Sequence, residues 1–264
     1  MTDLTPLDRA HAAMEAAPED DALRLRFFER LADAELVLLL EDEPDGNDVK
    51  PRLFPVEQQS FVLVFDREER LTAFTAGPAP YAALSGRMLA ELLCQQRLGL
   101  GLNLDVAPSA MLLPPEAVAW LARTVGETPE EAIAVPEEIM APFGLPEVLI
   151  AALDTKLALA AGLAQFAYLA GVRYADGRQG HLLAFVDVLP GAEDGLAQAV
   201  REALVFSGVE AGEIDVTFVK AADPAAGRFA RHGLRFDLPD LPEDSAQTPG
   251  ANPGLDPSRP PRLK

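Results

Sequence analysis

The sequence predicts an α+β protein that is built from two small mixed α/β sandwich domains. Its 264 residues are about right for two domains, and its hydrophobic content of 49% is enough for real cores. Prolines and glycines punctuate the stretch 126–145, which we interpret as a Pro-rich linker. We therefore expect domains at 1–125 and 146–238, followed by a disordered tail at 239–264, where seven of 26 residues are proline.

The expected first domain begins with two amphipathic helices. Leu7, His11 and Met14 lie at helical spacing, and Pro18 ends that segment. Three acidic residues at 19–21 then suit the positive N-terminus of a second helix. The apolar face of this second helix consists of Leu23, Phe27, Phe28 and Leu31.

Short apolar runs between loop residues predict the rest of the first domain. We expect strands at 35–40, 52–57, 60–65, 98–104 and 110–113, and helices at 67–73, 81–93 and 116–123. Ser85 is expected to cap a helix, and Pro115 pre-organises the first turn of the last one.

The expected second domain has a compact order of helices and strands, with one further short strand in the linker at 132–135. Asp176-Gly177 between two apolar runs is a strong hairpin signal. The predicted helices are 147–161, 194–206 and 223–231, and the predicted strands are 165–174, 180–188, 214–219 and 233–236. This order favours a small open-faced sandwich.

Charge and targeting signals limit the possible partners. The formal net charge is -20 and the pI is near 4.4, which disfavours binding to nucleic acid or to an anionic membrane. The N-terminus lacks the features of a signal peptide, and no apolar run is long enough to span a bilayer. We therefore expect a cytoplasmic protein that binds neither nucleic acid nor membrane.

No set of residues in the sequence predicts catalysis. Ser85 lacks the glycine flanks of a nucleophile elbow, and we expect Cys94 to be an inert, partly buried thiol. Gly99-Leu100-Gly101 lacks the third glycine of a dinucleotide loop, and no Walker loop occurs. We therefore expect no catalytic residue and no cofactor.

Metal binding is not predicted either. The three histidines are far apart, and a single cysteine excludes a Cys-rich site. The acidic loop 41–46 resembles the start of a calcium loop, but Arg52 stands where the bidentate carboxylate is needed. We interpret this loop as solvated, and we interpret the acidic pairs 130–131 and 137–138 in the same way.

Two features favour contacts with other molecules. Tyr81, Arg87 and Asn103 are polar residues in an otherwise apolar stretch, and they could converge at the mouth of a ligand pocket. Structural hydrogen bonding of loop backbone is the alternative for Arg87 and Asn103. The helix 147–161 is apolar on more than one face, so it is either buried in a core or part of a subunit contact.

The stretch 76–121, AGPAPYAALSGRMLAELLCQQRLGLGLNLDVAPSAMLLPPEAVAWL, resembles the N-terminal domain of the SseB family of bacterial proteins. The segments LPEVLIAALDTKLA, FAYLAGVRY and HLLAFVDV, within 146–238, resemble that family's C-terminal domain. The resemblance covers nearly the whole chain apart from the first twenty residues and the tail. It implies no particular reaction and no set of functional residues, and the family's name refers to a serine-sensitivity phenotype.

These observations together predict a non-catalytic protein-interaction or regulatory module of the SseB type. Its partner would be another protein or a second copy of the chain. The alternative is a binding protein or enzyme for a small molecule such as an amino acid, with a pocket near Tyr81, Arg87 and Asn103. An exposed apolar patch would favour the first function, and a concave pocket at these three residues would favour the second.

Overall fold

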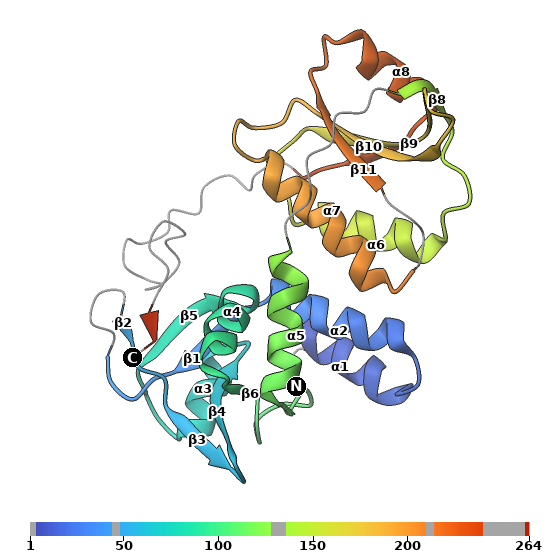
Figure 1. The fold of residues 1–264 in the computed structure, drawn as a ribbon. Coiled ribbons are helices and arrows are strands. Elements are labelled where there is room, and N and C mark those ends of the chain that lie inside the picture. Colours follow the sequence, from blue (N-terminus) through green and yellow to red (C-terminus); the bar gives the residue numbers. More distant parts are fainter. Residues whose placement is uncertain (1–3, 44–47, 128–135, 210–213, 240–261, 264) are drawn as a thin grey trace. The chain divides into compact units, whose positions relative to one another are not determined.

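The computed structural model describes residues 4–43, 48–127, 136–209, 214–239 and 262–263 (Figure 1). The chain divides into two compact units, one formed by residues 1–127 with 246–264 and the other by residues 128–245. Each unit has helices and its own mixed sheet, so the predicted α+β class is confirmed.

Two capped helices open the first unit. Helix α1 (Pro6–Ala16) begins with a capping box, in which Thr5 Oγ1 accepts from the Asp8 N–H and the Asp8 carboxylate accepts from the Thr5 N–H. Helix α2 (Asp21–Asp33) is capped by Asp20. Leu7 and Met14 of α1 and Phe27 and Leu31 of α2 are buried, as the helical spacing predicts.

The sheet of the first unit has the strand order β5-β1-β4-β6-β7, with β3 paired to β4 as a hairpin. Strands β4 and β6 are parallel, and the other pairs in this sheet are antiparallel. A short strand β13 pairs in parallel with β2. The strands are β1 (Glu35–Leu39), β2 (Asp48–Val49), β3 (Leu53–Val56), β4 (Gln59–Phe65), β5 (Tyr81–Ser85), β6 (Gly99–Leu102), β7 (Met111–Leu113) and β13 (Arg262–Leu263).

Helices pack onto this sheet. Helix α3 (Glu68–Thr75) lies against β1 and β4, where Leu71 and Phe74 meet an apolar cluster that includes Leu63 and Phe65. Helices α4 (Gly86–Gln96) and α5 (Pro115–Gly126) pack against each other and against α2, and α5 also contacts β6 and β7.

The predicted helix at 81–93 is wrong in its first five residues. Tyr81–Ser85 forms the edge strand β5, in register with Glu35–Leu39 of β1, and the helix begins only at Gly86. Residues with ordinary helical propensity become a strand here because β1 supplies a pairing partner that lies far away in sequence. The capping role predicted for Ser85 is confirmed, since its Oγ accepts from the Met88 N–H at 3.3 Å.

The sheet of the second unit has the order β11-β10-β9-β12, and β8 also pairs with β9. Helices α6 and α7 cover one face, and α8 covers the other. Strands β10 and β11 are parallel, and the remaining pairs are antiparallel. The elements are β8 (Pro136–Met140), α6 (Glu147–Leu157), β9 (Phe166–Tyr174), β10 (Gln179–Val186), α7 (Glu193–Ser207), β11 (Ile214–Val219), α8 (Pro224–His232) and β12 (Leu234–Asp237).

Strand β8 lies inside the stretch that the sequence predicts to be linker. Its Ile139 and Met140 stand opposite Val172 and Gly171 of β9, so residues 136–140 belong to the second sheet. The prolines and paired glutamates of this stretch have low strand propensity, so the strand forms only because β9 pairs with it. The predicted strand at 132–135 and most of the predicted tail, residues 240–261 and 264, lie outside the described residues.

Candidate functional site

The structure does not bring the three predicted site residues to one pocket. Tyr81 donates a hydrogen bond to Glu68 Oε1 on α3 at 2.8 Å. Arg87, in the first turn of α4, pairs with Asp33 at the end of α2 at 2.9 Å. Asn103 is fully buried, with other partners. The hydrogen bond to the Glu68 carboxylate raises the pKa of Tyr81, as expected for a structural contact.

Asn103 has the structural role that the sequence left as its alternative. It follows β6 with a φ of 46°, a left-handed conformation that asparagine tolerates better than most residues. Its Oδ1 accepts from the Asp66 N–H at 3.2 Å, and its Nδ2 donates to Ser109 Oγ at 2.9 Å. Asn103 therefore holds the loop between β6 and β7 against the end of β4.

These contacts are part of a larger buried polar network around Arg70. The Arg70 guanidinium donates to Asp8 Oδ1 at 3.0 Å and to Asp66 Oδ1 at 2.7 Å. Ser109 donates to Asp8 Oδ1 at 2.6 Å, and Thr5 donates to Asp66 Oδ2 at 2.7 Å. Burial raises the pKa of Asp8, but hydrogen bonds from Arg70, Ser109 and Thr5 outweigh it and hold this pKa well below its usual range. The network ties α1 to the sheet, and we interpret it as structural because these polar groups satisfy one another.

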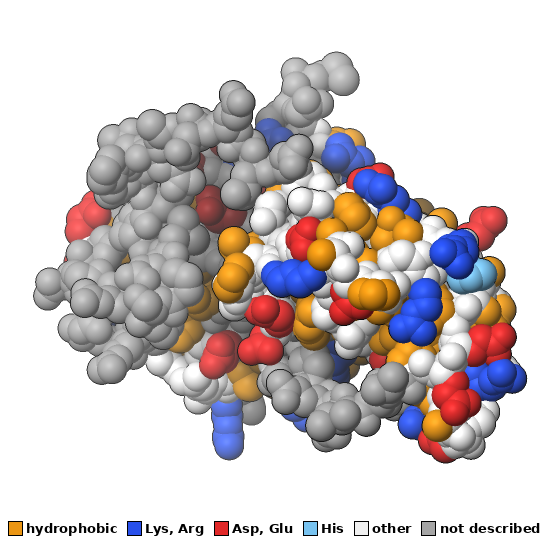
Figure 2. All heavy atoms as spheres, turned by 90° about the horizontal axis from the view of Figure 1, so that it is seen from above, with side chains coloured by type: hydrophobic (Ala, Val, Ile, Leu, Met, Phe, Trp, Pro, Cys, Tyr) orange, Lys and Arg blue, Asp and Glu red, His pale blue; other side chains and the backbone are white. Residues whose placement is uncertain are grey.

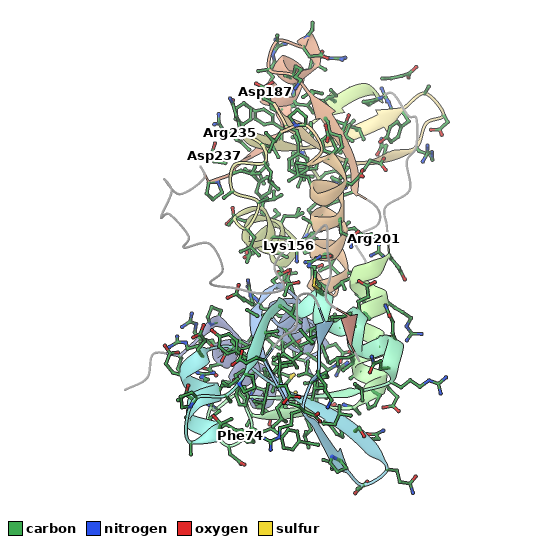
Figure 3. The ribbon with its side chains drawn as sticks, turned by 90° about the vertical axis from the view of Figure 1, so that its left-hand side faces the viewer. Phe74, Lys156, Asp187, Arg201, Arg235 and Asp237 are labelled. Carbon is green, nitrogen blue, oxygen red and sulfur yellow. The ribbon has the colours of Figure 1, made fainter. Side chains whose placement is uncertain are left out.

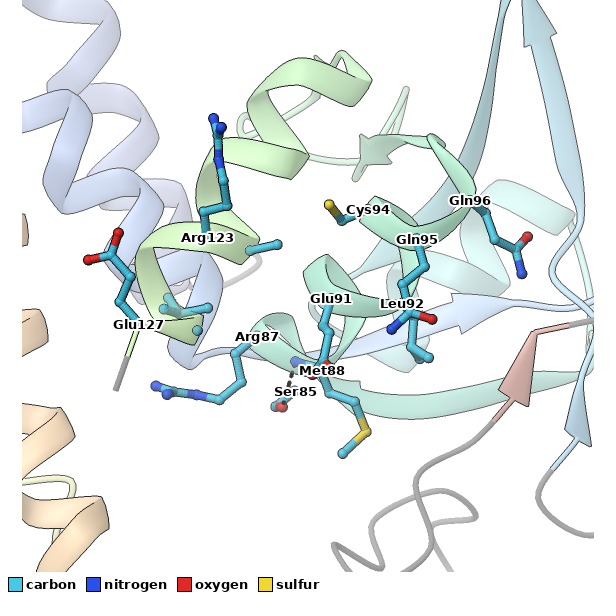
Figure 4. Close-up of a pocket in the computed structure, with 13 residues that line it drawn as sticks. Ser85, Arg87, Met88, Glu91, Leu92, Cys94, Gln95, Gln96, Arg123 and Glu127 are labelled. Carbon is cyan, nitrogen blue, oxygen red and sulfur yellow. Dashed lines mark hydrogen bonds between the residues drawn. The ribbon is translucent and has the colours of Figure 1, made fainter. Parts of the chain in front are cut away.

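A groove lies between α4 and α5 in the first unit (Figure 4). Its volume is about 1100 Å³. Arg87 is the only one of the three predicted site residues in its lining, and Cys94, a partly buried thiol, is also there. The side chains that Figure 4 labels around it are Ser85, Arg87, Met88, Glu91, Leu92, Cys94, Gln95, Gln96, Arg123 and Glu127. Two arginines and two glutamates make this groove suited to a small molecule that carries both signs of charge.

Helix α6 in the second unit is buried in a core on one face, which is one of the two alternatives that the sequence predicts. Leu149, Leu153 and Leu157 are buried in the core beneath the sheet. Val148 keeps 46% of its surface exposed, and Leu159, just beyond the helix, keeps 59%. The helix is thus a core element on one face, and it also presents apolar side chains at the surface.

A smaller groove runs between α6 and β12. Its volume is about 350 Å³. One stripe of α6 forms one wall, and the edge strand β12 forms the other. The residues that line it are Glu147, Ile150, Ala151, Asp154, Leu234, Arg235 and Phe236. Its α6 wall has an apolar centre between two acids, and its β12 wall adds two apolar residues and Arg235.

The comparison with protein families concerns the unit that holds the α4–α5 groove. Residues 7–120 match the SseB protein N-terminal domain. The resemblance predicted for this part of the chain is therefore confirmed, and the match begins earlier than expected, at α1. Neither a curated protein nor a solved structure matches the chain.

Apart from Thr5, the residues of the Arg70 network lie within the matched residues 7–120, and so do most of the residues that line the α4–α5 groove. The α6–β12 groove lies outside the matched residues. Among the helices that the structure describes, none is long and apolar enough to cross a membrane. Across the same described residues, no group of three or more His, Cys, Asp or Glu side chains is placed to hold a metal ion.

Proposed function

We propose that the chain is a non-catalytic, cytoplasmic protein-interaction module of the SseB type, whose second unit is the family's C-terminal domain. The exposed apolar side chains around α6 and β12 carry this proposal. Val148, Leu159 and Leu234 each keep 39% or more of their surface exposed, and Leu234 lies on the edge strand β12. Apolar side chains beside an open edge suit a protein partner better than a small solute.

The character of the surface also supports a protein partner. On the face shown in Figure 2, hydrophobic side chains lie among Lys, Arg, Asp and Glu side chains. Protein interfaces are about as apolar as the rest of a protein surface, so this mixture is compatible with a protein partner. A uniformly acidic surface would have counted against the proposal.

Photo-crosslinking tests this function directly. A benzophenone amino acid at Val148, in the full chain inside cells, should give one or a few discrete protein adducts. The same probe at Glu116, an exposed position on α5 of the first unit, serves as the control. Identical adducts at both positions, or none at Val148, would contradict the proposal. An adduct with the chain itself would make the partner a second copy.

A second candidate function is small-molecule binding in the α4–α5 groove, because its volume and its charged lining suit a ligand such as an amino acid. A thermal unfolding panel of amino acids, nucleotides and sugars tests it. A ligand at about 100 times its dissociation constant adds roughly 2.7 kcal/mol of stability. A ligand-induced rise in unfolding temperature that disappears in Arg123→Ala but persists in Arg24→Ala would favour this function, because Arg24 is an exposed residue of α2 outside the groove.

A further inference from the structure

The outer edge of β12 has main-chain groups that β9 does not use. Leu234 stands opposite Leu169 and Phe236 opposite Ala167, and the Leu238 N–H donates to Gln165 O at 3.3 Å. In an antiparallel pair such bonds recur at every second residue, so the backbone groups of Leu234 and Phe236 also face β9. Those of Arg235 and Asp237 therefore face away from it. Within the described part of the chain, β12 pairs with β9 alone.

The charged side chains of β12 lie on the opposite face of the strand from Leu234 and Phe236, although Arg235 is among the residues that line the groove. Phe236 is buried in the core beside α6, and Leu234 lines the groove. Because side chains alternate along a strand, Arg235 and Asp237 lie on the opposite face. There the Arg235 guanidinium lies 4.3 Å from the centre of the Phe166 ring and pairs with Asp237 (Figure 3). The side chains of Arg235 and Asp237 therefore do not block the pairing of another strand with the outer edge of β12.

The facing wall of the groove is one stripe of α6. Glu147, Ile150, Ala151 and Asp154 follow one another at the i, i+3, i+4 and i+7 spacing of a single helix face. The two acids are separated by about 10 Å along the helix axis, at 1.5 Å per residue. Ile150 and Ala151 between them, with Leu234 opposite, form an apolar centre.

We propose that the β12 edge binds an extended basic peptide segment of a partner protein as an added strand. Its backbone would pair with Arg235 and Asp237, and every second side chain would point toward α6. Such side chains are about 6.6 Å apart, so two of them four residues apart span about 13 Å. The pattern basic–x–apolar–x–basic therefore fits, since lysine or arginine reaches each acid while the apolar residue fills the centre. This inference rests on the proposed interaction function and names its partner class.

A fluorescence anisotropy titration of the full chain tests whether the site prefers a basic peptide. The probe is a labelled peptide Gly-Lys-Thr-Val-Thr-Lys-Gly, and its control has glutamate in place of lysine. We expect the basic peptide to bind at least 10-fold more tightly. The double variant Glu147→Lys with Asp154→Lys should reverse this preference. Glu116→Lys with Glu137→Lys alters two other exposed acids, makes the same change in net charge, and should not reverse it.

Backbone N-methylation tests strand addition. One peptide is methylated at its lysine and valine amides, and another at its threonine amides. Only one of these sets can face β12, so one peptide should lose at least 10-fold in affinity and the other should keep its affinity within about threefold. The amides of Arg235 and Asp237 should also exchange hydrogen at least 10-fold more slowly in the complex. Binding that survives both methylations would overturn the proposal.

The outcomes separate this inference from the proposed function. A protein adduct at Val148 without any binding of the basic peptide would retain the interaction function and overturn the peptide class. Equal binding of the basic and acidic peptides would do the same. Self-association that the double variant abolishes would assign the edge to a second copy of the chain instead.

Discussion

Arg70 connects three segments of the first unit through side chains that water barely reaches. Its side chain is 7% exposed, and its partners Asp8 and Asp66 are 0% and 5% exposed. A buried charge is tolerated only when it is paired and hydrogen-bonded. This network was not predicted from the sequence, because Asp8 meets Arg70 and Ser109, which are about 60 and 100 positions away in the chain.

Arg70→Met should therefore strongly destabilise the first unit. The substitution leaves two carboxylates buried without their cation, and breaking a buried pair in this way typically costs about 3–5 kcal/mol. Arg24→Met is the matched control, because Arg24 pairs with Asp21 at the surface. This substitution should change the free energy of unfolding by less than about 0.5 kcal/mol. Urea unfolding measures both. Equal small effects would mean that the network contributes nothing.

The decrease in the free energy of unfolding at acid pH should depend on Asp8. Its pKa is lowered in the folded state, so its contribution is fully present above the unfolded value of about 3.9 and is lost as the pH falls below it. Asp8→Asn should be less stable at pH 7, by about 2–3 kcal/mol. The difference from the natural chain should stay constant down to about pH 5 and should narrow below about pH 4, because position 8 no longer titrates. Parallel curves from pH 7 to pH 3 would contradict this assignment.

At the scale of elements, the junction of α2 and α4 depends on the absence of a side chain. A Cβ added at Gly86 would lie 1.8 Å from the Leu31 carbonyl oxygen, so no alanine fits without moving one helix. The helix N-terminus also carries the Ser85 cap and the Gly86 N–H bond to Ala34 O at 2.9 Å. The β5–α4 boundary is thus set by its packing against α2.

Gly86→Ala should destabilise the first unit by about 3 kcal/mol or more, the upper range for an overpacked site. Gly126→Ala, at the last residue of α5, meets open space and should be neutral or stabilising by up to about 1 kcal/mol. Guanidinium unfolding of the two variants separates these expectations. A neutral Gly86→Ala would mean that α2 and α4 are not in contact in solution.

The elements also show which predictions a sequence pattern supports. Helices with one apolar face and strands of continuous apolar residues lie close to where their pattern places them, as in α7 and β4. Strands β5 and β8 do not, because short mixed segments become strands only when a partner strand completes the ladder. The α6 wall of the groove was recognisable from its surplus of apolar positions. The β12 wall could not be recognised from the sequence, because the position of a strand at the edge depends on the order of strands in the sheet.

At the scale of the whole molecule, each unit has its own apolar core, so we propose that the two units unfold independently. The chain has one tryptophan, Trp120, which lies on α5 of the first unit. Its fluorescence should therefore report on the first unit, while far-UV circular dichroism reports on both.

Two glycine variants test this independence. A Cβ at Gly171 of β9 would lie 2.8 Å from the Ala141 carbonyl oxygen, so Gly171→Ala should destabilise the second unit. It should lower a circular dichroism midpoint and leave the Trp120 fluorescence midpoint unchanged. Gly86→Ala should do the reverse. If both variants moved both midpoints together, the chain would be a single cooperative unit.

The sequence was sufficient to predict the α+β class, the order of most elements, the Ser85 cap and the resemblance of the stretch 76–121 to the SseB N-terminal domain. Those properties arise from neighbouring residues, from spacing and from capping, all of which are local. Only the tertiary structure decided that Tyr81, Arg87 and Asn103 have separate partners and that α6 and an open strand edge form a groove. The physical reason is that burial, ion pairing and strand order depend on residues brought together from distant parts of the chain.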